Sequence, residues 1–596
     1  MFTLRKLAFL LTRRQRLQAV VLLALMVIGM ALEMLGISLV LPALMLMTRG
    51  VGTAGSPAAH SIAHLLGNPT REQVVVWGML ALVGVYALKT VFLTFLLWRQ
   101  MRFVYGVQAE LSYRLLARYL HQPYLFHLHR NSAFLIRNAT SEVTLFSHIL
   151  LGSALNFLAD GLVLAGIAAV LLIVEPLGTI IIAVSLATVA YVFHLSTRRL
   201  VSDWGSARHT HSGRLIQCLH QGLGGVKDVL LLARQQYFLD QYQTHNLGCA
   251  RASRNQDTLH QTPRLALELL AILGLAIFVL FKIRSGVAVD SLVPTIGLFA
   301  AAAFRIMPSA NRVMAAAHHV QYALPALSAL YDEFSPADVA VAPHGEVTPL
   351  TLQHSIRLTD VTFAYPGAAA PALSRIELTI ACGTMVGFIG GSGAGKTTLV
   401  NVLLGLLPPD SGRVEVDGAD IAPQLRSWQR TIGYVPQAIF LIDDSLRQNI
   451  AFGIPADRID EVAVLSAVSA VQLEEFVASL PEGLDTPVGE RGVRLSGGQL
   501  QRIGIARALY HNPSVLVLDE ATSSLDTQTE RSVMRAVDAL HGEKTIIIVA
   551  HRLSTLQDCD RVFRLEEGRL VAEGDAGSMI GSTPRSVVER VSEAGR

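Results

Sequence analysis

The sequence has little charge, few cysteines and almost no excess of basic residues. Only 16% of its 596 residues are charged and 51% are hydrophobic, with a mean hydropathy of +0.44, which excludes a charge-rich disordered chain. The net charge of +3 is too small to indicate nucleic-acid binding. Cys218, Cys249, Cys382 and Cys559 form no CxxC motif or Cys/His pair, so neither a metal site nor a disulfide framework is predicted. A chain this apolar must lie partly in lipid.

Long apolar runs are concentrated in the first 330 residues or so. A membrane helix needs about 20 mainly apolar residues, and the run Gln18–Met47 carries only one charge, Glu33. This run is too long for a signal-peptide core and no A-x-A cleavage signal follows closely, so it predicts a retained helix. Five more runs complete six predicted spans: Val74–Trp98, Leu145–Val174, Leu177–His194, Leu265–Phe281 and Leu292–Ala317.

The distribution of arginine and lysine predicts the orientation. These residues accumulate in cytoplasmic loops, and they are frequent between spans two and three and between spans four and five. The loops on the opposite side have few, although Lys282 and Arg284 run against the trend. Both termini are therefore predicted to be cytoplasmic.

The two basic loops show helical periodicity and are predicted to continue the membrane helices into the cytoplasm. Their tips, Gln122–Phe126 and Gly224–Asp228, are natural places for short transverse helices that touch another domain. After the sixth span the composition changes to strand and helix segments with ordinary charge. We expect an all-α transmembrane domain over residues 1–330, a linker over 331–349 and a soluble α/β domain over 350–596.

A nucleotide site is predicted where an apolar strand, a glycine-rich loop and a helix follow one another. The loop reads Gly390-Gly391-Ser392-Gly393-Ala394-Gly395-Lys396-Thr397-Thr398, which is the P-loop pattern in its strand–loop–helix context. Its glycines let backbone N–H groups surround phosphate oxygens, Lys396 neutralises the β- and γ-phosphates of ATP, and Thr397 binds Mg²⁺. A second apolar strand ends in Asp519, a further Mg²⁺ ligand, and Glu520, which would orient and polarise the attacking water.

Between these segments lies Leu495-Ser496-Gly497-Gly498-Gln499, and here the chain resembles the ATP-binding-cassette family, whose signature is this pentapeptide. The resemblance assigns further roles by position. It implies that Tyr365 stacks on adenine, that Gln437 senses Mg²⁺ and contacts the membrane domain, that Asp526 belongs to the D-loop and that His551 contacts the γ-phosphate.

The family's arrangement also implies a dimer. In it, Ser496 and Gly498 of one chain close on ATP held by Lys396 of the other. The P-loop, Glu520, the signature and His551 all match the catalytic pattern, which favours a homodimer over a heterodimer with one degenerate site. Six spans fused to one such domain resemble the exporter-type half-transporters over the whole chain.

Basic residues at membrane depth are the main indication of cargo. A charge at the centre of a membrane helix costs about 2.5–3.5 kcal/mol, so Lys89, Arg264, Arg305 and Arg312 are expected to face a cavity, where guanidinium groups suit phosphate or pyrophosphate. Structural alternatives remain open. Lys89 would then pair with Glu33, Arg264 would extend to the membrane interface, and Arg312 would lie at the cytoplasmic end of its helix.

A narrower resemblance concerns Phe304–Arg312, Gly225–Asp228 with Leu232–Arg234 and Tyr237–Leu239, and Ile37–Pro42. These segments look like the bacterial lipid-linked oligosaccharide flippase of protein glycosylation and its relatives. The resemblance implies alternating-access movement of a polyprenyl-pyrophosphate-linked glycan across the inner membrane. It also implies a short external helix between the first two spans, for which Ala58–Leu66 is the candidate; an ordinary capped loop is the alternative for these residues. The alternatives are a general lipid or multidrug exporter and a regulatory protein that binds ATP with little turnover.

Overall fold

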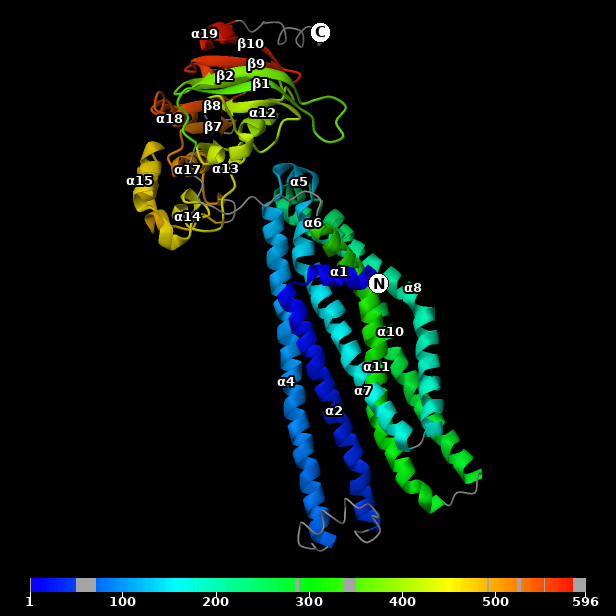
Figure 1. Cartoon of the computed structure of the whole chain (residues 1–596). Helices are drawn as coiled ribbons and strands as arrows, with labels where there is room; N and C mark the ends of the chain where they lie inside the picture. Colours follow the sequence, from blue (N-terminus) through cyan, green and yellow to red (C-terminus); the bar gives the residue numbers. More distant parts are fainter. Residues whose placement is uncertain are drawn as a thin grey trace. The chain divides into compact units, whose positions relative to one another are not determined.

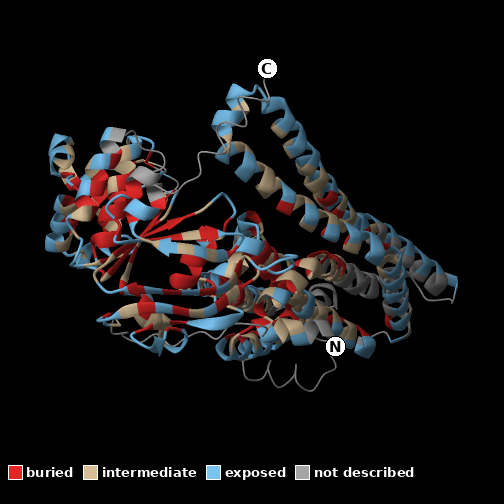
Figure 2. Ribbon diagram, turned by 90° about the horizontal axis from the view of Figure 1, so that it is seen from above, coloured by how far each residue is buried: buried red, intermediate tan, exposed pale blue. Residues whose placement is uncertain are grey.

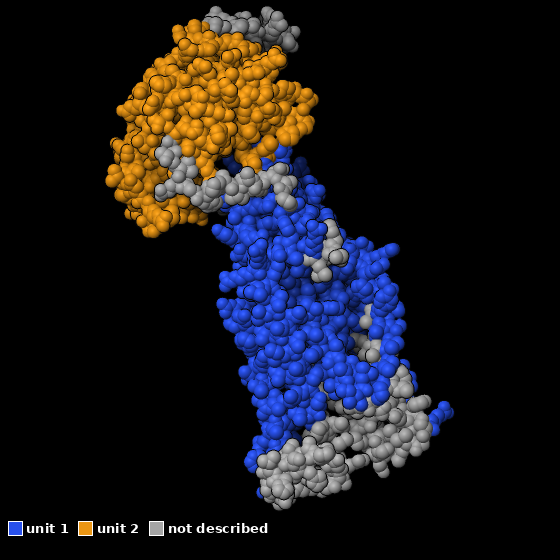
Figure 3. All heavy atoms as spheres, viewed as in Figure 1, with its two compact units in different colours: residues 1–122, 126–341 blue, residues 123–125, 342–596 orange. Residues whose placement is uncertain are grey.

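The structure is a computed structural model that describes residues 2–49, 71–174, 176–284, 289–335, 350–489, 492–521, 527–550 and 552–581. It forms two compact units (Figure 3). The first unit is helical and consists of Met1–Gln122 and Phe126–Val341. The second consists of Ala342–Arg596 together with the three residues Pro123–Leu125. The predicted external helix at Ala58–Leu66 lies outside the described residues.

Each of the six predicted spans lies on a long helical stretch of the first unit (Figure 1). The long helices are α2 (Arg13–Arg49), α4 (Arg71–Leu120), α7 (Gly152–Val174), α8 (Pro176–Gly224), α10 (Gln235–Arg284) and α11 (Val289–Phe334). Shorter segments are α1 (Phe2–Leu10), α5 (Tyr124–His129), α6 (Ser132–Arg137), α9 (Val226–Leu231) and the π-helical stretches Asn138–Glu142 and Leu145–Leu151. Short helices therefore form at both predicted loop tips, as α5 and α9.

Three described stretches, Arg13–Gly36, Val76–Leu120 and Ser132–Ile173, are long and apolar enough to cross a membrane. The other three predicted spans lie on helices whose side chains are described only in part. Helix α11 continues to Phe334, four residues into the range expected to be linker. It continues because α1 packs on its end, where Lys6 donates a hydrogen bond to Ser328 and the ring of Phe9 lies edge-on to Tyr331.

The main core of the helical unit lies mostly where the helices extend beyond their apolar runs. Leu111 and Leu115 of α4 are buried there with Phe146 and with Leu327 and Leu330 of α11. Gly205 of α8 allows a close approach to α11, because an added Cβ would lie 2.4 Å from the carbonyl oxygen of Tyr322. Helix packing in the predicted cytoplasmic extensions thus holds the unit together.

The second unit contains two sheets. The four-stranded sheet is antiparallel, in the order β2 (Leu373–Ala381), β1 (Ser355–Phe363), β4 (Ser411–Val416), β5 (Ala419–Asp420). The six-stranded sheet has the order β10 (Arg569–Gly574), β9 (Arg561–Glu566), β3 (Met385–Ile389), β8 (Thr545–Val549), β7 (Val515–Asp519), β6 (Ile432–Val435), and all its pairs are parallel except β9 with β10.

Helices surround these sheets. They are α12 (Lys396–Leu403), α13 (Leu425–Gln429), α14 (Leu446–Ile450), α15 (Glu461–Ala470), α16 (Glu474–Ser479), α17 (Gly497–Leu509), α18 (Thr527–Asp538) and α19 (Ala576–Gly581), with 3₁₀ turns at Ala422–Gln424, Ala456–Arg458, Gly483–Asp485 and Leu553–Leu556. Every residue of β3, β7 and β8 is buried (Figure 2). Continuous apolar runs of this kind are typical of parallel strands covered on both faces. The expected α/β architecture is confirmed.

Candidate active site

The P-loop connects the end of β3 to the start of α12. Gly393 and Gly395 have φ angles of 79° and 98°, the left-handed region that glycine adopts at no steric cost. A Cβ on Gly395 would also lie 2.7 Å from the carbonyl oxygen of Ala372. The ammonium of Lys396 donates to the carbonyl oxygens of Gly390 and Gly391, at 2.9 and 3.0 Å. These bonds hold the lysine across the loop.

Side chains of the loop divide into exposed and buried ones. Ser392 and Thr397 are exposed, whereas Thr398 is buried and its hydroxyl lies 3.2 Å from the hydroxyl of Tyr365. The ring of Tyr365 also packs edge-on against Phe363 at 5.0 Å. The aromatic residue expected to contact adenine is therefore held beside the P-loop.

Two carboxylates lie at the carboxyl end of β7, where Asp519 is the last residue of the strand and Glu520 follows it. Strands β3 and β7 both pair in parallel with β8, so their carboxyl ends meet there. Asp519 is 4% exposed, and its Oδ1 atom has no hydrogen-bond partner among the described residues. Its Oδ2 accepts a hydrogen bond from the Tyr434 hydroxyl at 3.4 Å. A buried, unpartnered carboxylate oxygen fits a hard cation such as Mg²⁺.

Glu520 adopts a left-handed backbone conformation, with a φ of 51°. Its Oε2 accepts a hydrogen bond of 2.6 Å from the amide of Gln437. The structure thus brings together two residues predicted to act in catalysis, although they are far apart in the chain. Tyr434 of β6, which was not predicted as a site residue, lies three residues before Gln437 in the chain. Its position near the end of a strand, close to the Gln437 motif, was the signal that could have identified it.

Burial alters the proton affinities of this site. Burial is the main cause that raises the pKa of Asp519, and the neighbouring charge of Glu520 raises it further, while Tyr434 and Lys396 lower it. Burial likewise lowers the pKa of Lys396, partly offset by Glu520 and Asp519. Burial therefore disfavours the charged forms of Asp519 and Lys396, and the neighbouring charges of the chain offset this only in part. A bound Mg²⁺ ion and phosphate would supply the missing opposite charges.

The signature segment lies on a different element, the start of α17. Ser496 caps this helix, because its hydroxyl accepts from the backbone N–H of Gln499 at 3.3 Å and its own N–H donates to the Gln499 side chain at 2.8 Å. Ser496 and Gly497 are exposed, Gly498 and Gln499 are half-buried, and a Cβ on Gly497 would meet nothing within 4 Å. Asp526 and His551 lie outside the described residues.

Known proteins share this sequence pattern. Residues 373–523 match the ABC transporter family. The chain is 30% identical over 527 residues to the ATP-dependent lipid A-core flippase of Thiobacillus denitrificans, covering 86% of this chain and 88% of that one. The same-named protein of Cupriavidus metallidurans is 31% identical over 480 residues, covering 80% of each. The chain belongs to the ABC transporter family.

A solved structure of a bacterial Atm1-family ABC exporter with ATP bound has the same fold. The TM-score is 0.76, with 98% of this chain and 99% of that chain covered and 23% sequence identity. This ABC transporter is therefore an exporter-type half-transporter, a multi-pass membrane protein whose ATP-binding ATPase domain drives transmembrane movement.

Within the transmembrane half of this ABC exporter, Lys89 pairs with Glu33. The ammonium lies 3.0 Å from Glu33 Oε2, and the two side chains are 13% and 1% exposed. Lys89 also lies over the ring of Tyr86, 4.7 Å from its centroid. The geometry therefore favours the structural alternative for Lys89, a buried ion pair, over a cation that faces a cavity.

The other predicted cargo residues differ in their surroundings. Arg264 is exposed and pairs with Glu268 one turn along α10, at 2.8 Å. Arg312 makes two hydrogen bonds to Asp160 of α7, from Nη2 at 2.6 Å and from Nε at 2.8 Å. The Arg305 side chain lies outside the described atoms. Neither acidic partner was predicted, although an acidic residue inside a predicted span, such as Asp160, indicates a partner for a basic residue at the same depth.

Proposed function

We propose that this ABC exporter works as a homodimer in the bacterial inner membrane and moves a phosphate-bearing glycolipid by alternating access. Its two ATP sites would each combine the P-loop of one chain with Ser496 and Gly498 of the other. The exposed start of α17 supports this arrangement, because the capping hydrogen bonds occupy the N–H groups of Ser496 and Gln499 but not those of Gly497 and Gly498. Asp519 and Thr397 would bind Mg²⁺, and Glu520, positioned by Gln437, would orient the attacking water.

Closure of the ATP sites would reach the membrane through the short helices at the loop tips, α5 and α9. Tyr124 in α5 and Val226 in α9 are 39% and 47% exposed at these tips, which supports this role. Hydrolysis at Glu520, with His551 on the γ-phosphate, would then reset the helices.

The cargo proposal rests mainly on Arg312. Asp160 and the Ser309 hydroxyl, which accepts from Nη2 at 3.1 Å, orient this guanidinium, yet its side chain remains 47% exposed. A guanidinium has five N–H donors, so a fixed carboxylate on one edge leaves donors for a phosphate. In a homodimer two such groups would be present. We assign a polyprenyl-pyrophosphate-linked oligosaccharide as cargo, as the segment Phe304–Arg312 implies.

A second candidate cargo is lipid A-core, which the name of the relatives favours. Purified protein in proteoliposomes separates the two, because ATPase stimulation and translocation can be measured with a polyprenyl-pyrophosphate glycan, with lipid A-core and with a neutral drug. The compound that stimulates ATP hydrolysis and is translocated identifies the class of cargo. Equal stimulation by the neutral drug would contradict both glycolipid assignments.

Arg312→Ala tests the phosphate contact itself. Loss of a hydrogen bond to a charged group, about 1.5–3 kcal/mol, should lower glycolipid translocation per ATP hydrolysed by about tenfold or more. Arg264→Ala is the matched control, since Arg264 pairs with a carboxylate one helical turn away on an exposed surface. Unchanged coupling in the Arg312 variant would refute a phosphate role for this residue.

A further inference from the structure

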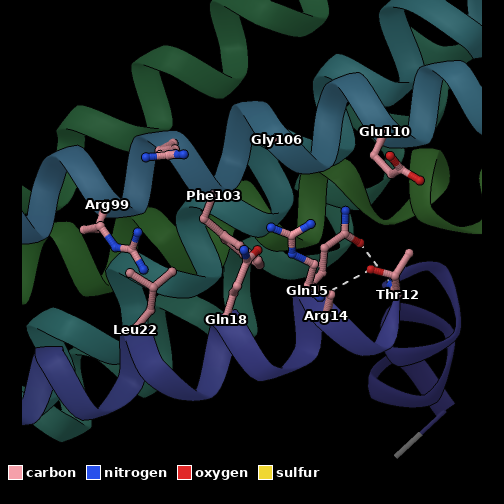
Figure 4. A pocket seen from close by; sticks show the side chains of 10 residues that line it. Thr12, Arg14, Gln15, Gln18, Leu22, Arg99, Phe103, Gly106 and Glu110 are labelled. Carbon is pink, nitrogen blue, oxygen red and sulfur yellow. Dashed lines mark hydrogen bonds between the residues drawn. The ribbon is translucent and has the colours of Figure 1, made fainter.

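A cavity of about 500 Å³ lies between the first two long helices, α2 and α4 (Figure 4). Its lining from α4 comes from one helix face, at positions that recur every three or four residues. Gln15, Leu22 and Phe103 are its buried residues. The lining residues are Thr12, Arg14, Gln15, Gln18, Leu22, Arg99, Arg102, Phe103, Gly106 and Glu110.

Three guanidinium groups line this cavity. Arg14 and Arg102 are exposed and Arg99 is half-buried. Among the described residues, none of the three forms an ion pair, in contrast to Lys89 and Arg312. Glu110 is the one acidic lining residue, and in Figure 4 it lies at the end of the cavity away from Arg99. The cavity is therefore cationic, with guanidinium donors available to an anion.

The cavity lies at the predicted cytoplasmic boundary of the membrane. Gln18 begins the first predicted span, and Arg99 directly follows the end of the second. One helical turn toward the membrane from Arg99 and Arg102 are two exposed aromatic residues, Phe95 and Trp98, with side chains 45% and 52% exposed. The guanidinium of Arg102 lies 5.3 Å from the ring of Trp98. Tryptophan is typical of the lipid headgroup level, so Trp98 supports this placement.

Apolar surface continues from the cavity into the predicted span. Leu88 and Val91 lie three helical turns before Arg99 and Arg102 on the same side of α4, and they are 61% and 69% exposed. A free phosphate would use only the arginines. A phospholipid would use both features, since its phosphate would contact the guanidinium groups while its acyl chains lie along the apolar surface.

We infer that this cavity binds the phosphate of an anionic phospholipid from the cytoplasmic leaflet. The inference does not depend on which cargo is moved, and the cavity residues include none of the residues assigned to cargo or ATP. Gly106 enlarges the cavity, because a Cβ there would meet no atom within 4 Å. Arg14, Arg99 and Arg102 supply the charge, and the α2–α4 pair supplies the frame.

Binding is measured on the full-length purified protein in detergent, titrated with fluorescent phosphatidylglycerol and with fluorescent phosphatidylcholine. Wild-type protein should prefer phosphatidylglycerol, and the triple variant Arg14→Gln/Arg99→Gln/Arg102→Gln should lose this preference. The expected loss is about fivefold per arginine and roughly a hundredfold for all three. The single variant Arg102→Gln, at an exposed position, should lose about fivefold.

A matched triple variant removes the same charge elsewhere. Arg13, Arg198 and Arg199 are exposed, lie near the predicted cytoplasmic ends of spans one and four, and do not line the cavity. Arg13→Gln/Arg198→Gln/Arg199→Gln should keep the preference for phosphatidylglycerol. An equal loss in both triple variants would overturn the site, because the effect would then reflect net charge alone.

A steric variant tests the cavity without changing charge. Gly106→Leu should fill it and weaken phosphatidylglycerol binding, whereas Gly84→Leu, on the same helix and equally free of contacts within 4 Å, should not. Full binding by the Gly106 variant would overturn the inference. Competition with inorganic phosphate tests whether the site takes a lipid or a soluble phosphate. If millimolar phosphate displaces the lipid at constant ionic strength, the site takes a soluble phosphate and the lipid assignment is wrong.

Discussion

The two units of this ABC exporter place the same kinds of residue in opposite environments. In the nucleotide-binding unit the apolar strands β3, β7 and β8 are entirely buried. On the predicted span of α4, by contrast, Trp77, Leu80 and Val91 are 62%, 61% and 69% exposed. Lipid replaces the protein core around such residues. Apolar composition therefore indicates burial in one unit and contact with lipid in the other.

Charged groups show the reverse contrast. At predicted membrane depth, Lys89 and Arg312 each have a carboxylate partner in the same chain. In the nucleotide site, Asp519 keeps a buried oxygen that has no hydrogen-bond partner within the described part of the chain. Pairing lowers the cost of a charge at membrane depth, and Arg312 still keeps N–H donors that its carboxylate does not use. The nucleotide site instead keeps a carboxylate oxygen available to a cation.

The largest effect should come from the nucleotide site. Glu520→Gln keeps the hydrogen-bonding shape but removes the carboxylate, so ATP hydrolysis should fall by about 10²- to 10⁴-fold while ATP binding persists. Phosphate release measures the hydrolysis, and a fluorescent ATP analogue measures the binding. Glu543→Gln, at an exposed position of the same unit, is the control. If the Glu520 variant retains full function without hydrolysis, ATP binding alone is sufficient, as expected for a regulatory protein with little turnover.

The second test concerns the paired charges of the helical unit. Lys89→Met leaves Glu33 buried without its cation, which should destabilise the protein by about 3–5 kcal/mol. Thermal unfolding in detergent should show the loss, and Glu33→Met/Lys89→Met should recover much of it. Arg264→Met, which breaks an exposed pair, should cost about 1 kcal/mol or less. A stable Lys89 variant with impaired transport would return this lysine to the cargo site.

The third test separates helix capping from ATP binding across the dimer. Ser496→Ala and Ser445→Ala each remove a serine that caps a helix, α17 and α14, so each should cost about 1 kcal/mol of stability. Only the Ser496 variant should also lose ATPase activity, because only its hydroxyl is proposed to contact ATP of the partner chain. Equal activity losses would indicate that the signature serine acts through helix stability alone.

The smallest effect is expected at Tyr365. Tyr365→Phe removes the hydrogen bond to Thr398, worth about 1 kcal/mol, and keeps the ring. The Kd for ATP should therefore change by about fivefold at most. Tyr365→Ala also removes the stacking surface, worth about 1–3 kcal/mol per base, and should weaken binding further. If both variants bind ATP equally, the ring does not stack on adenine.

Local patterns were sufficient for much of the fold. The apolar runs predict the long helices because about 20 consecutive apolar residues form a helix in lipid whatever surrounds them. Helix α1 was not predicted, because its nine residues are too short to show an apolar run of this length and its contacts with α11 hold it in place. The end of α11 escaped for the same reason.

The sequence by itself determined the nucleotide site, because the P-loop needs its glycines, lysine and threonine consecutively on a strand–loop–helix unit. Tertiary structure decided which charges are partnered. Asp160 meets Arg312 because α7 packs on α11, and Glu33 meets Lys89 because α2 packs on α4. Such pairs depend on the rotation and offset of packed helices, which a helical period does not specify. The same packing of α2 on α4 brings Arg14 into one cavity with Arg99 and Arg102 and makes this cavity cationic.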